Sequence, residues 1–96
     1  MVFRKNDLVR YTIRKALGLS VDDIELASIV GTTNLPSMRR AVSHVADKLV
    51  TEKNGHLRCG LCGRGPFTRR GLYLHLTRVH SEEILELINS YIEETE

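Results

Sequence analysis

The sequence predicts an α+β protein that is mostly helical. Apolar residues recur at helical spacing in three stretches before residue 50, a turn signal after them indicates a β-hairpin, and cysteines and histidines follow. At 96 residues, with 42% hydrophobic and 27% charged side chains, the chain is too short for two independent cores of ordinary size. We therefore expect a small globular protein that needs an additional source of stability.

The first two helices are predicted over residues 7–17 and 21–30. In the first stretch the apolar residues fall on one helical face, and Gly18 is suited to end the helix because glycine adopts positive φ without strain. Ser20 can cap the start of the second helix through its hydroxyl. The polar residues of 31–34 then make the turn into a third helix.

The third helix is predicted over residues 36–50 and a β-hairpin over residues 50–58. Pro36 suits the first turn of a helix, and one apolar stripe follows it, formed by Met38, Ala41, Val42, Val45 and Leu49. Asn54 and Gly55 supply the two positive φ values that a type I′ turn requires.

Three short helices followed by a hairpin resemble the winged helix-turn-helix family, and the run from Pro36 to Val42 is similar to the start of its recognition helix. The resemblance implies that the third helix enters the DNA major groove. The residues it places near phosphates or base edges are Ser37, Arg39, Arg40, Ser43 and His44. The alternative is that three amphipathic helices form a small core with a solvated basic face.

Cys59, Cys62, His75 and His80 are separated by two, twelve and four residues. Two thiolates two residues apart can hold one side of a tetrahedral zinc ion, and two imidazoles about one helical turn apart can hold the other side. We predict one structural Zn2+ ion, because four protein ligands leave no open coordination position for catalysis. A redox-active role for the cysteine pair is disfavoured. Such a pair follows a strand of a βαβ unit, whereas a hairpin precedes Cys59.

This spacing resembles the C2H2 zinc finger family over residues 55–80, and the family implies a ββα unit whose helix carries both histidines. The aromatic residue expected after the second cysteine is one place late, at Phe67, which can still fill the small core from a shifted backbone. His56, three residues before Cys59, remains an alternative ligand. Because residues 56–58 belong both to the hairpin and to this unit, we expect the two modules to form a nearly rigid body.

The finger helix has few side chains suited to reading bases. In DNA-reading members of the family, the base-facing positions correspond to Thr68, Gly71 and Leu74, and neither glycine nor leucine offers a bidentate contact. The arginines of this segment are instead suited to phosphates. They are Arg58, Arg64, Arg69, Arg70 and Arg78. The alternative is that they form a solvated face on a scaffold.

A last amphipathic helix is predicted over residues 81–96, which makes three segments of the chain: 1–54, 55–80 and 81–96. Its apolar face must be buried, either against the N-terminal helices or in a homodimer through residues 84–92. Small helix-turn-helix proteins commonly bind DNA as dimers, so we favour the homodimer.

Charge is distributed unevenly along the chain. Residues 55–80 hold five arginines and no acid, whereas residues 81–96 hold six glutamates and no base. A cationic block suits a polyanion such as nucleic acid. With no signal peptide and no apolar run of membrane-spanning length, we expect an intracellular protein without a membrane partner, whose thiols stay reduced and available to metal.

The function that these observations predict is a zinc-stabilised protein that binds double-stranded DNA and regulates transcription. The third helix would read the major groove and the basic finger would anchor on phosphates. In style the chain is similar to small DNA-binding regulators of archaea and their viruses. The rival is a protein-interaction adaptor that uses the C-terminal apolar helix. RNA binding is disfavoured by the scarcity of aromatics, 5% of the chain. Neither an enzyme nor a small-molecule substrate is expected, because no catalytic arrangement is recognisable.

Overall fold

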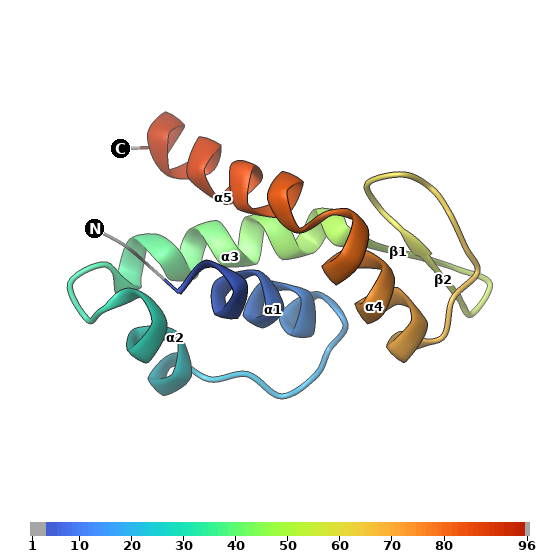
Figure 1. The fold of residues 1–96 in the computed structure, drawn as a ribbon, viewed down its shortest axis with the longest axis horizontal. Coiled ribbons are helices and arrows are strands. Elements are labelled where there is room, and N and C mark those ends of the chain that lie inside the picture. Colours follow the sequence, from blue (N-terminus) through green and yellow to red (C-terminus); the bar gives the residue numbers. More distant parts are fainter. Residues whose placement is uncertain (1–3, 96) are drawn as a thin grey trace.

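The computed structural model describes residues 4–95 and is mostly helical, with a single β-hairpin (Figure 1). Its elements are α1 (Lys5–Ala16), α2 (Asp23–Val30), α3 (Leu35–Leu49), β1 (Val50–Lys53), β2 (His56–Cys59), α4 (Arg69–Val79) and α5 (Ser81–Thr95). The predicted segment 1–54 includes residues 1–3, and the predicted segment 81–96 includes residue 96. These four residues lie outside the described part of the chain. The coarse α+β class is confirmed, while the winged-helix and zinc-finger architectures remain predictions.

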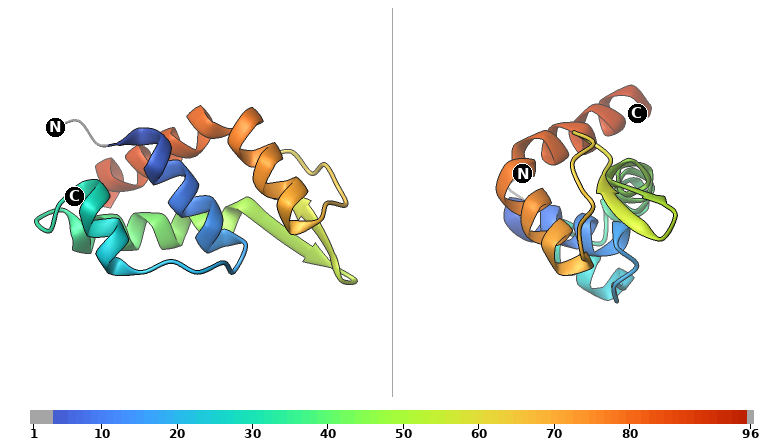
Figure 2. Two further views of the ribbon diagram at one scale, coloured as in Figure 1. Left: turned by 60° about the horizontal axis from the view of Figure 1, so that its bottom comes forward. Right: turned by 90° about the vertical axis from the view of Figure 1, so that its right-hand side faces the viewer.

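Helix α3 is the centre of the fold, because α1, α2 and α5 all pack on it. The predicted apolar stripe of α3 is buried, and Ala41 and Leu49 are completely inaccessible to solvent. Helix α1 also packs on α4, which lies beside it in Figure 2.

Helix α1 ends at the predicted glycine. Gly18 has φ +74°, and the N–H of Leu19 donates to the carbonyl oxygen of Arg14 at 2.9 Å. This closure satisfies a helix-terminal carbonyl in the way that a glycine after the last turn permits. The helix begins at Lys5, two residues earlier than expected, where Arg4 forms an ion pair with Asp7.

The predicted cap of α2 is wrong. Asp22, not Ser20, caps the helix: its Oδ1 accepts a hydrogen bond from the N–H of Glu25 at 2.8 Å. The loop before α2 is held against α1 by the hydroxyl of Tyr11, which donates to the carbonyl oxygen of Asp22. Because α1 fixes the loop at Asp22, the helix starts there rather than two residues earlier.

The hairpin follows α3 without a linker, since Leu49 ends the helix and Val50 begins β1. Asn54 and Gly55 have φ values of +55° and +79°, which confirms the predicted turn. The strands pair antiparallel, with Lys53 opposite His56. The free edge of β2 is extended by one bridge, in which the N–H of Phe67 donates to the carbonyl oxygen of Leu57 at 2.8 Å.

Helix α5 folds back along α3 after a break at His80. Ile84 and Ile88 are completely buried, and α5 packs on both α1 and α3. Much of its apolar face is therefore covered within the chain. The apolar residues of α5 that are only half-buried are Leu85, Leu87, Tyr91 and Ile92. The homodimer through residues 84–92 stays a prediction, and these are the positions available to it.

Candidate metal centre and basic surface

Four residues from three parts of the fold converge at the end of the hairpin. Cys59 ends β2, Cys62 lies in the following loop, His75 is on α4 and His80 ends that helix. One ligand atom from each lies within 4.8 Å of all the others, and Cys62 Sγ is 3.3 Å from His75 Nε2. These separations suit one ion bound by sulfur and nitrogen atoms at roughly 2.0 to 2.3 Å. The four residues could therefore hold one metal ion.

The loop that carries the cysteines rests directly on the end of α3. The N–H of Gly60 donates to the carbonyl oxygen of Leu49 at 2.8 Å, and the N–H of Gly63 donates to the carbonyl oxygen of Cys59 at 2.8 Å. A Cβ atom at Gly60 would lie 2.0 Å from the carbonyl oxygen of Lys48. Only glycine permits this approach, so the cysteine loop is tied to the central helix.

The two thiols have different environments. A hydrogen bond from the backbone N–H of Arg64, reinforced by the nearby imidazoles of His80 and His75, lowers the pKa of Cys62 to about 6. Burial raises the pKa of Cys59, although the N–H groups of Leu61 and Cys62 point at its sulfur and oppose the shift. Backbone N–H groups that donate to sulfur also stabilise a metal-bound thiolate.

The surroundings of His80 are those of a metal-binding histidine. The side chain is buried, its Nδ1 lies 2.9 Å from Oε1 of Glu83, and its Nε2 is buried without a hydrogen-bond partner. A buried polar atom without a partner costs free energy, whereas a metal ion would satisfy it. A carboxylate on the other ring nitrogen is the usual way in which proteins orient a histidine ligand. Glu83 was not predicted as a site residue, although its place three residues after His80 puts it one helical turn from that ligand.

The surroundings of the centre are apolar on one side. The ring of Phe67 stacks on that of His75 with centroids 4.9 Å apart, and Leu72 is completely buried beneath them. Phe67 thus fills the small core as expected, despite its shifted place in the sequence. The alternative ligand His56 is exposed, pairs across the hairpin with Lys53 and is not part of the cluster.

The predicted DNA-facing residues of α3 differ in what they contact. Arg39 pairs with Asp23 of α2 at 2.8 Å, and the ring of His44 lies 4.6 Å from that of Tyr91 on α5. Arg40 is exposed and has no ion pair with a described residue, and both Ser37 and Ser43 are half-buried. A hollow beside His44 is also lined by Lys48 and Glu94. The acidic helix α5 thus borders the outer face of α3.

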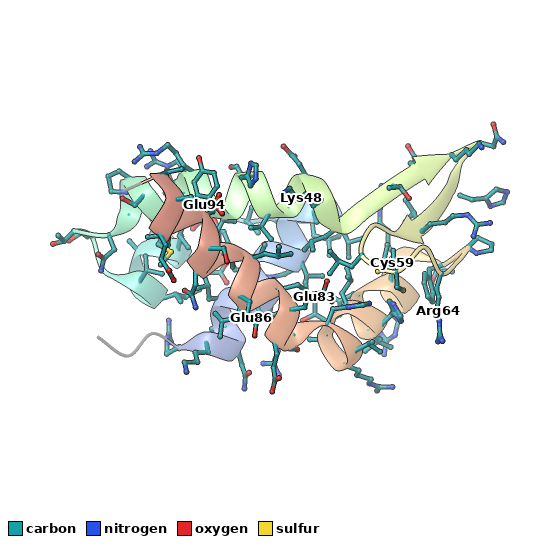
Figure 3. The ribbon with its side chains drawn as sticks, turned by 90° about the horizontal axis from the view of Figure 1, so that it is seen from above. Lys48, Cys59, Arg64, Glu83, Glu86 and Glu94 are labelled. Carbon is teal, nitrogen blue, oxygen red and sulfur yellow. The ribbon has the colours of Figure 1, made fainter. Side chains whose placement is uncertain are left out.

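The five arginines of residues 55–80 are all exposed, and none forms an ion pair with a carboxylate in residues 4–95. Arg58 donates to the carbonyl oxygen of Gly65 at 3.3 Å. Figure 3 shows the separation of charge: Glu83, Glu86 and Glu94 lie along α5, whereas Arg64 lies at the far end of the molecule, beside the hairpin. The surface around the metal centre is therefore cationic.

The residues at the base-facing positions expected on α4 have structural roles in the fold. The Thr68 hydroxyl oxygen accepts a hydrogen bond from the N–H of Gly71 at 3.0 Å and so caps the helix. A Cβ at Gly71 would lie 3.1 Å from that same oxygen. Leu74 is half-buried. These three positions are poorly placed for hydrogen bonds to bases.

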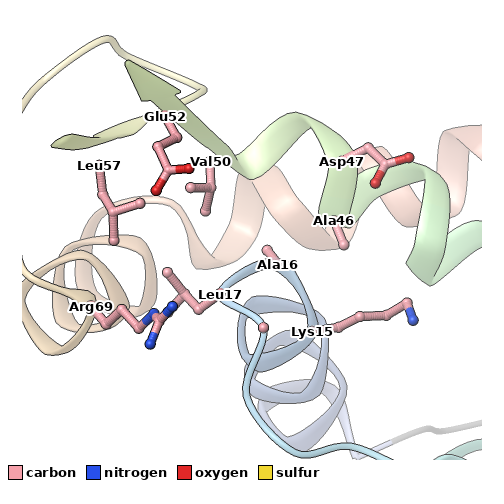
Figure 4. A pocket seen from close by; sticks show the side chains of 10 residues that line it. Lys15, Ala16, Leu17, Ala46, Asp47, Val50, Glu52, Leu57 and Arg69 are labelled. Atoms are coloured by element: carbon pink, nitrogen blue, oxygen red, sulfur yellow. The ribbon is translucent and has the colours of Figure 1, made fainter. Parts of the chain in front are cut away.

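A groove of about 490 Å³ lies between the end of α1, α3, the hairpin and the start of α4 (Figure 4). Its lining includes Leu17 and Leu57, and its rim carries two acidic and two basic side chains (Figure 4). The rim is formed by Lys15, Asp47, Glu52 and Arg69. Mixed charge of this kind offers a polyanion no net attraction.

Comparison with known proteins adds no relative. No protein-family model, no curated protein and no solved structure matches the chain. The function is therefore inferred from the geometry of the site. Among the described helices, none has both the length and the apolarity needed to cross a membrane.

Proposed function

We propose that the chain is a zinc-stabilised protein that binds double-stranded DNA and regulates transcription. The observation that carries this proposal is the set of five exposed arginines around the metal centre, which have no ion pair among the described residues. Exposed cations that are not used in the fold favour an anionic partner. Glu86 and Glu94 of the acidic helix α5 lie away from the hairpin, and Glu83 contacts His80 rather than an arginine.

Zinc is the ion that best suits the donor set. Two thiolates and two imidazoles form a common structural zinc site, and the four ligands leave no open position for a substrate. When bound, the ion would supply stability rather than reactivity, because it would join the hairpin, the cysteine loop and α4. Since Gly60 ties the loop to α3, the same ion would fix the arginines relative to the central helix.

We also propose that α3 reads the bases of the DNA, through Arg40, Ser43 and Arg39. The pair between Arg39 and Asp23 is about half exposed on each side, and such pairs contribute at most ~1 kcal/mol. A DNA phosphate or base edge could therefore replace Asp23 at little cost. His44 is a weaker candidate because its ring already packs against Tyr91.

The adaptor hypothesis has less support. It depends on the apolar face of the C-terminal helix, and Ile84 and Ile88 of that face are completely buried within the chain. Apart from that face, no cluster among the described residues indicates a protein partner.

Binding to a DNA duplex, measured over a range of salt concentrations, tests the proposal. We expect the zinc-loaded chain to bind with a steep salt dependence, which weakens in Arg69→Ala/Arg70→Ala and in Arg39→Ala/Arg40→Ala. Lys5→Ala/Lys15→Ala is the matched control, because it also removes two exposed cations, and both lie outside α3 and outside residues 55–80. Absence of salt-dependent duplex binding by the native chain would overturn the proposal.

A further inference from the structure

A cationic hollow lies between α1 and α4 and includes Arg78, one of the five arginines around the metal centre. A hollow of about 360 Å³ is lined by Arg10 of α1 and by Tyr73, Leu74, Thr77 and Arg78 of α4. No carboxylate is among these lining residues. Two arginines from helices far apart in the sequence therefore meet at one surface, which the sequence pattern could not indicate because the packing of α1 on α4 brings them together.

The two arginines are available to a ligand. Arg10 and Arg78 are exposed, and neither has an ion pair or a hydrogen bond with another described residue. Arg10 also lines the adjoining hollow, where Arg4 and Arg14 pair with Asp7 and Glu25 respectively. The two carboxylates of that hollow are thus already paired with other arginines, and Arg10 and Arg78 have no ion pair among the described residues.

The hollow is built on a rigid base. Leu72 and Leu76 on the inner face of α4 are completely buried, as is Ile13 of α1, so neither helix can move independently of the core. Tyr73 lines both hollows and forms the wall between them. The hydroxyl of Thr77 donates to the backbone carbonyl of Tyr73 and is not free for other contacts. A ligand would therefore meet a preformed site with two guanidinium groups.

We propose that Arg10 and Arg78 bind a phosphate of the DNA backbone, so that α1 is a DNA-contacting element beside the basic finger. This inference rests on the proposed function in taking duplex DNA as the ligand. Guanidinium groups suit phosphate because their planar donors match its oxygens in pairs. Arg70 lies on the same side of α4 as Arg78, eight residues or about 12 Å earlier along the helix axis, which is long enough to follow consecutive phosphates.

The test compares Arg10→Ala, Arg78→Ala and the double variant with Lys15→Ala in the zinc-loaded full chain. Lys15 is an exposed cation on the same helix, but it lines the groove that also contains Asp47 and Glu52. Each arginine removed should reduce the slope of log affinity against log salt by about 1, and so weaken binding about three- to four-fold more at 50 mM than at 200 mM salt. Lys15→Ala should leave the slope nearly unchanged.

The outcomes separate this inference from the function on which it rests. If the native chain fails to bind any duplex, the proposed function fails and this site fails with it. If the native chain binds and the Arg10 variant keeps the native slope, or loses no more than Lys15→Ala, the site is overturned while DNA binding stands. Equal thermal midpoints of the native chain and the four variants check that the exposed substitutions leave the fold intact.

Discussion

Replacement of Gly60 by alanine should weaken both the fold and the metal centre. The new Cβ would lie 2.0 Å from the carbonyl oxygen of Lys48 and 3.0 Å from the carbonyl carbon of Leu49, and these are backbone atoms that cannot rotate away. The cysteine loop must therefore move by about 1 Å to reach ordinary contact distance. That movement would break the hydrogen bond from Gly60 N–H to the Leu49 carbonyl oxygen.

The expected cost combines two terms. Overpacking costs about 1 to 3 kcal/mol and a lost backbone hydrogen bond about 0.5 to 1.5 kcal/mol, which gives about 1.5 to 4.5 kcal/mol in total. For a domain of this size the thermal midpoint should fall by roughly 6 to 36 °C. Thermal unfolding of the zinc-loaded protein, followed by circular dichroism, measures this shift.

Gly63→Ala is the matched control because Gly63 is in the same loop. A Cβ there meets no atom within 4 Å, and only the positive φ of +78° opposes the substitution. The expected cost is about 1 to 2 kcal/mol, smaller than at Gly60. If Gly60→Ala proves no less stable than Gly63→Ala, the cysteine loop does not rest on α3 as described and the reasoning is refuted.

Three further predictions concern the metal and the core. Cys62→Ser, or chelation of the native chain, should unfold residues 55–80, which loss of the corresponding helical signal would show; an unchanged spectrum would mean that metal is not structural here. Glu83→Ala should lower zinc affinity about 10-fold or more in a competition titration because His80 loses its orienting carboxylate, whereas Glu86→Ala, on the same helix, should not. Burial, and then the nearby carboxylates, raise the pKa of Tyr11 above its ordinary 10.0, so the folded state retains this proton longer than the unfolded chain. This contribution to stability is present below pH 10 and is lost as pH rises through the folded pKa; Tyr11→Phe should flatten the fall in unfolding free energy between pH 9 and 11, and an equally steep fall in both proteins would contradict this.

Features that depend on local chain chemistry could be predicted from the sequence. The apolar spacing in α3 identifies its buried stripe, because side chains three and four residues apart share a helical face. The turn at Asn54 and Gly55 follows from the few residues that tolerate positive φ. The four ligands follow from their spacing, and the structure brings all four within reach of one ion.

Features that depend on packing between distant elements could not be predicted. The periodicity of the last helix reveals an apolar face but not the surface that covers it, and α3 covers Ile84 and Ile88. The cap at Asp22 depends on Tyr11, eleven residues earlier. The meeting of Arg10 with Arg78 depends on how α1 packs against α4. Each requires a tertiary contact that no local pattern encodes.

The salt dependence of duplex DNA binding, measured with and without zinc, tests the central claim most directly. Arg10 and the five arginines of residues 55–80 could together contact six phosphates, at about 0.9 in slope for each. If between about three and all six of these contacts form, the zinc-loaded chain should show a slope between about −3 and −5, and chelation should weaken binding sharply. A slope near zero, or the same slope and affinity after the metal is removed, would contradict a zinc-held cationic surface that binds DNA.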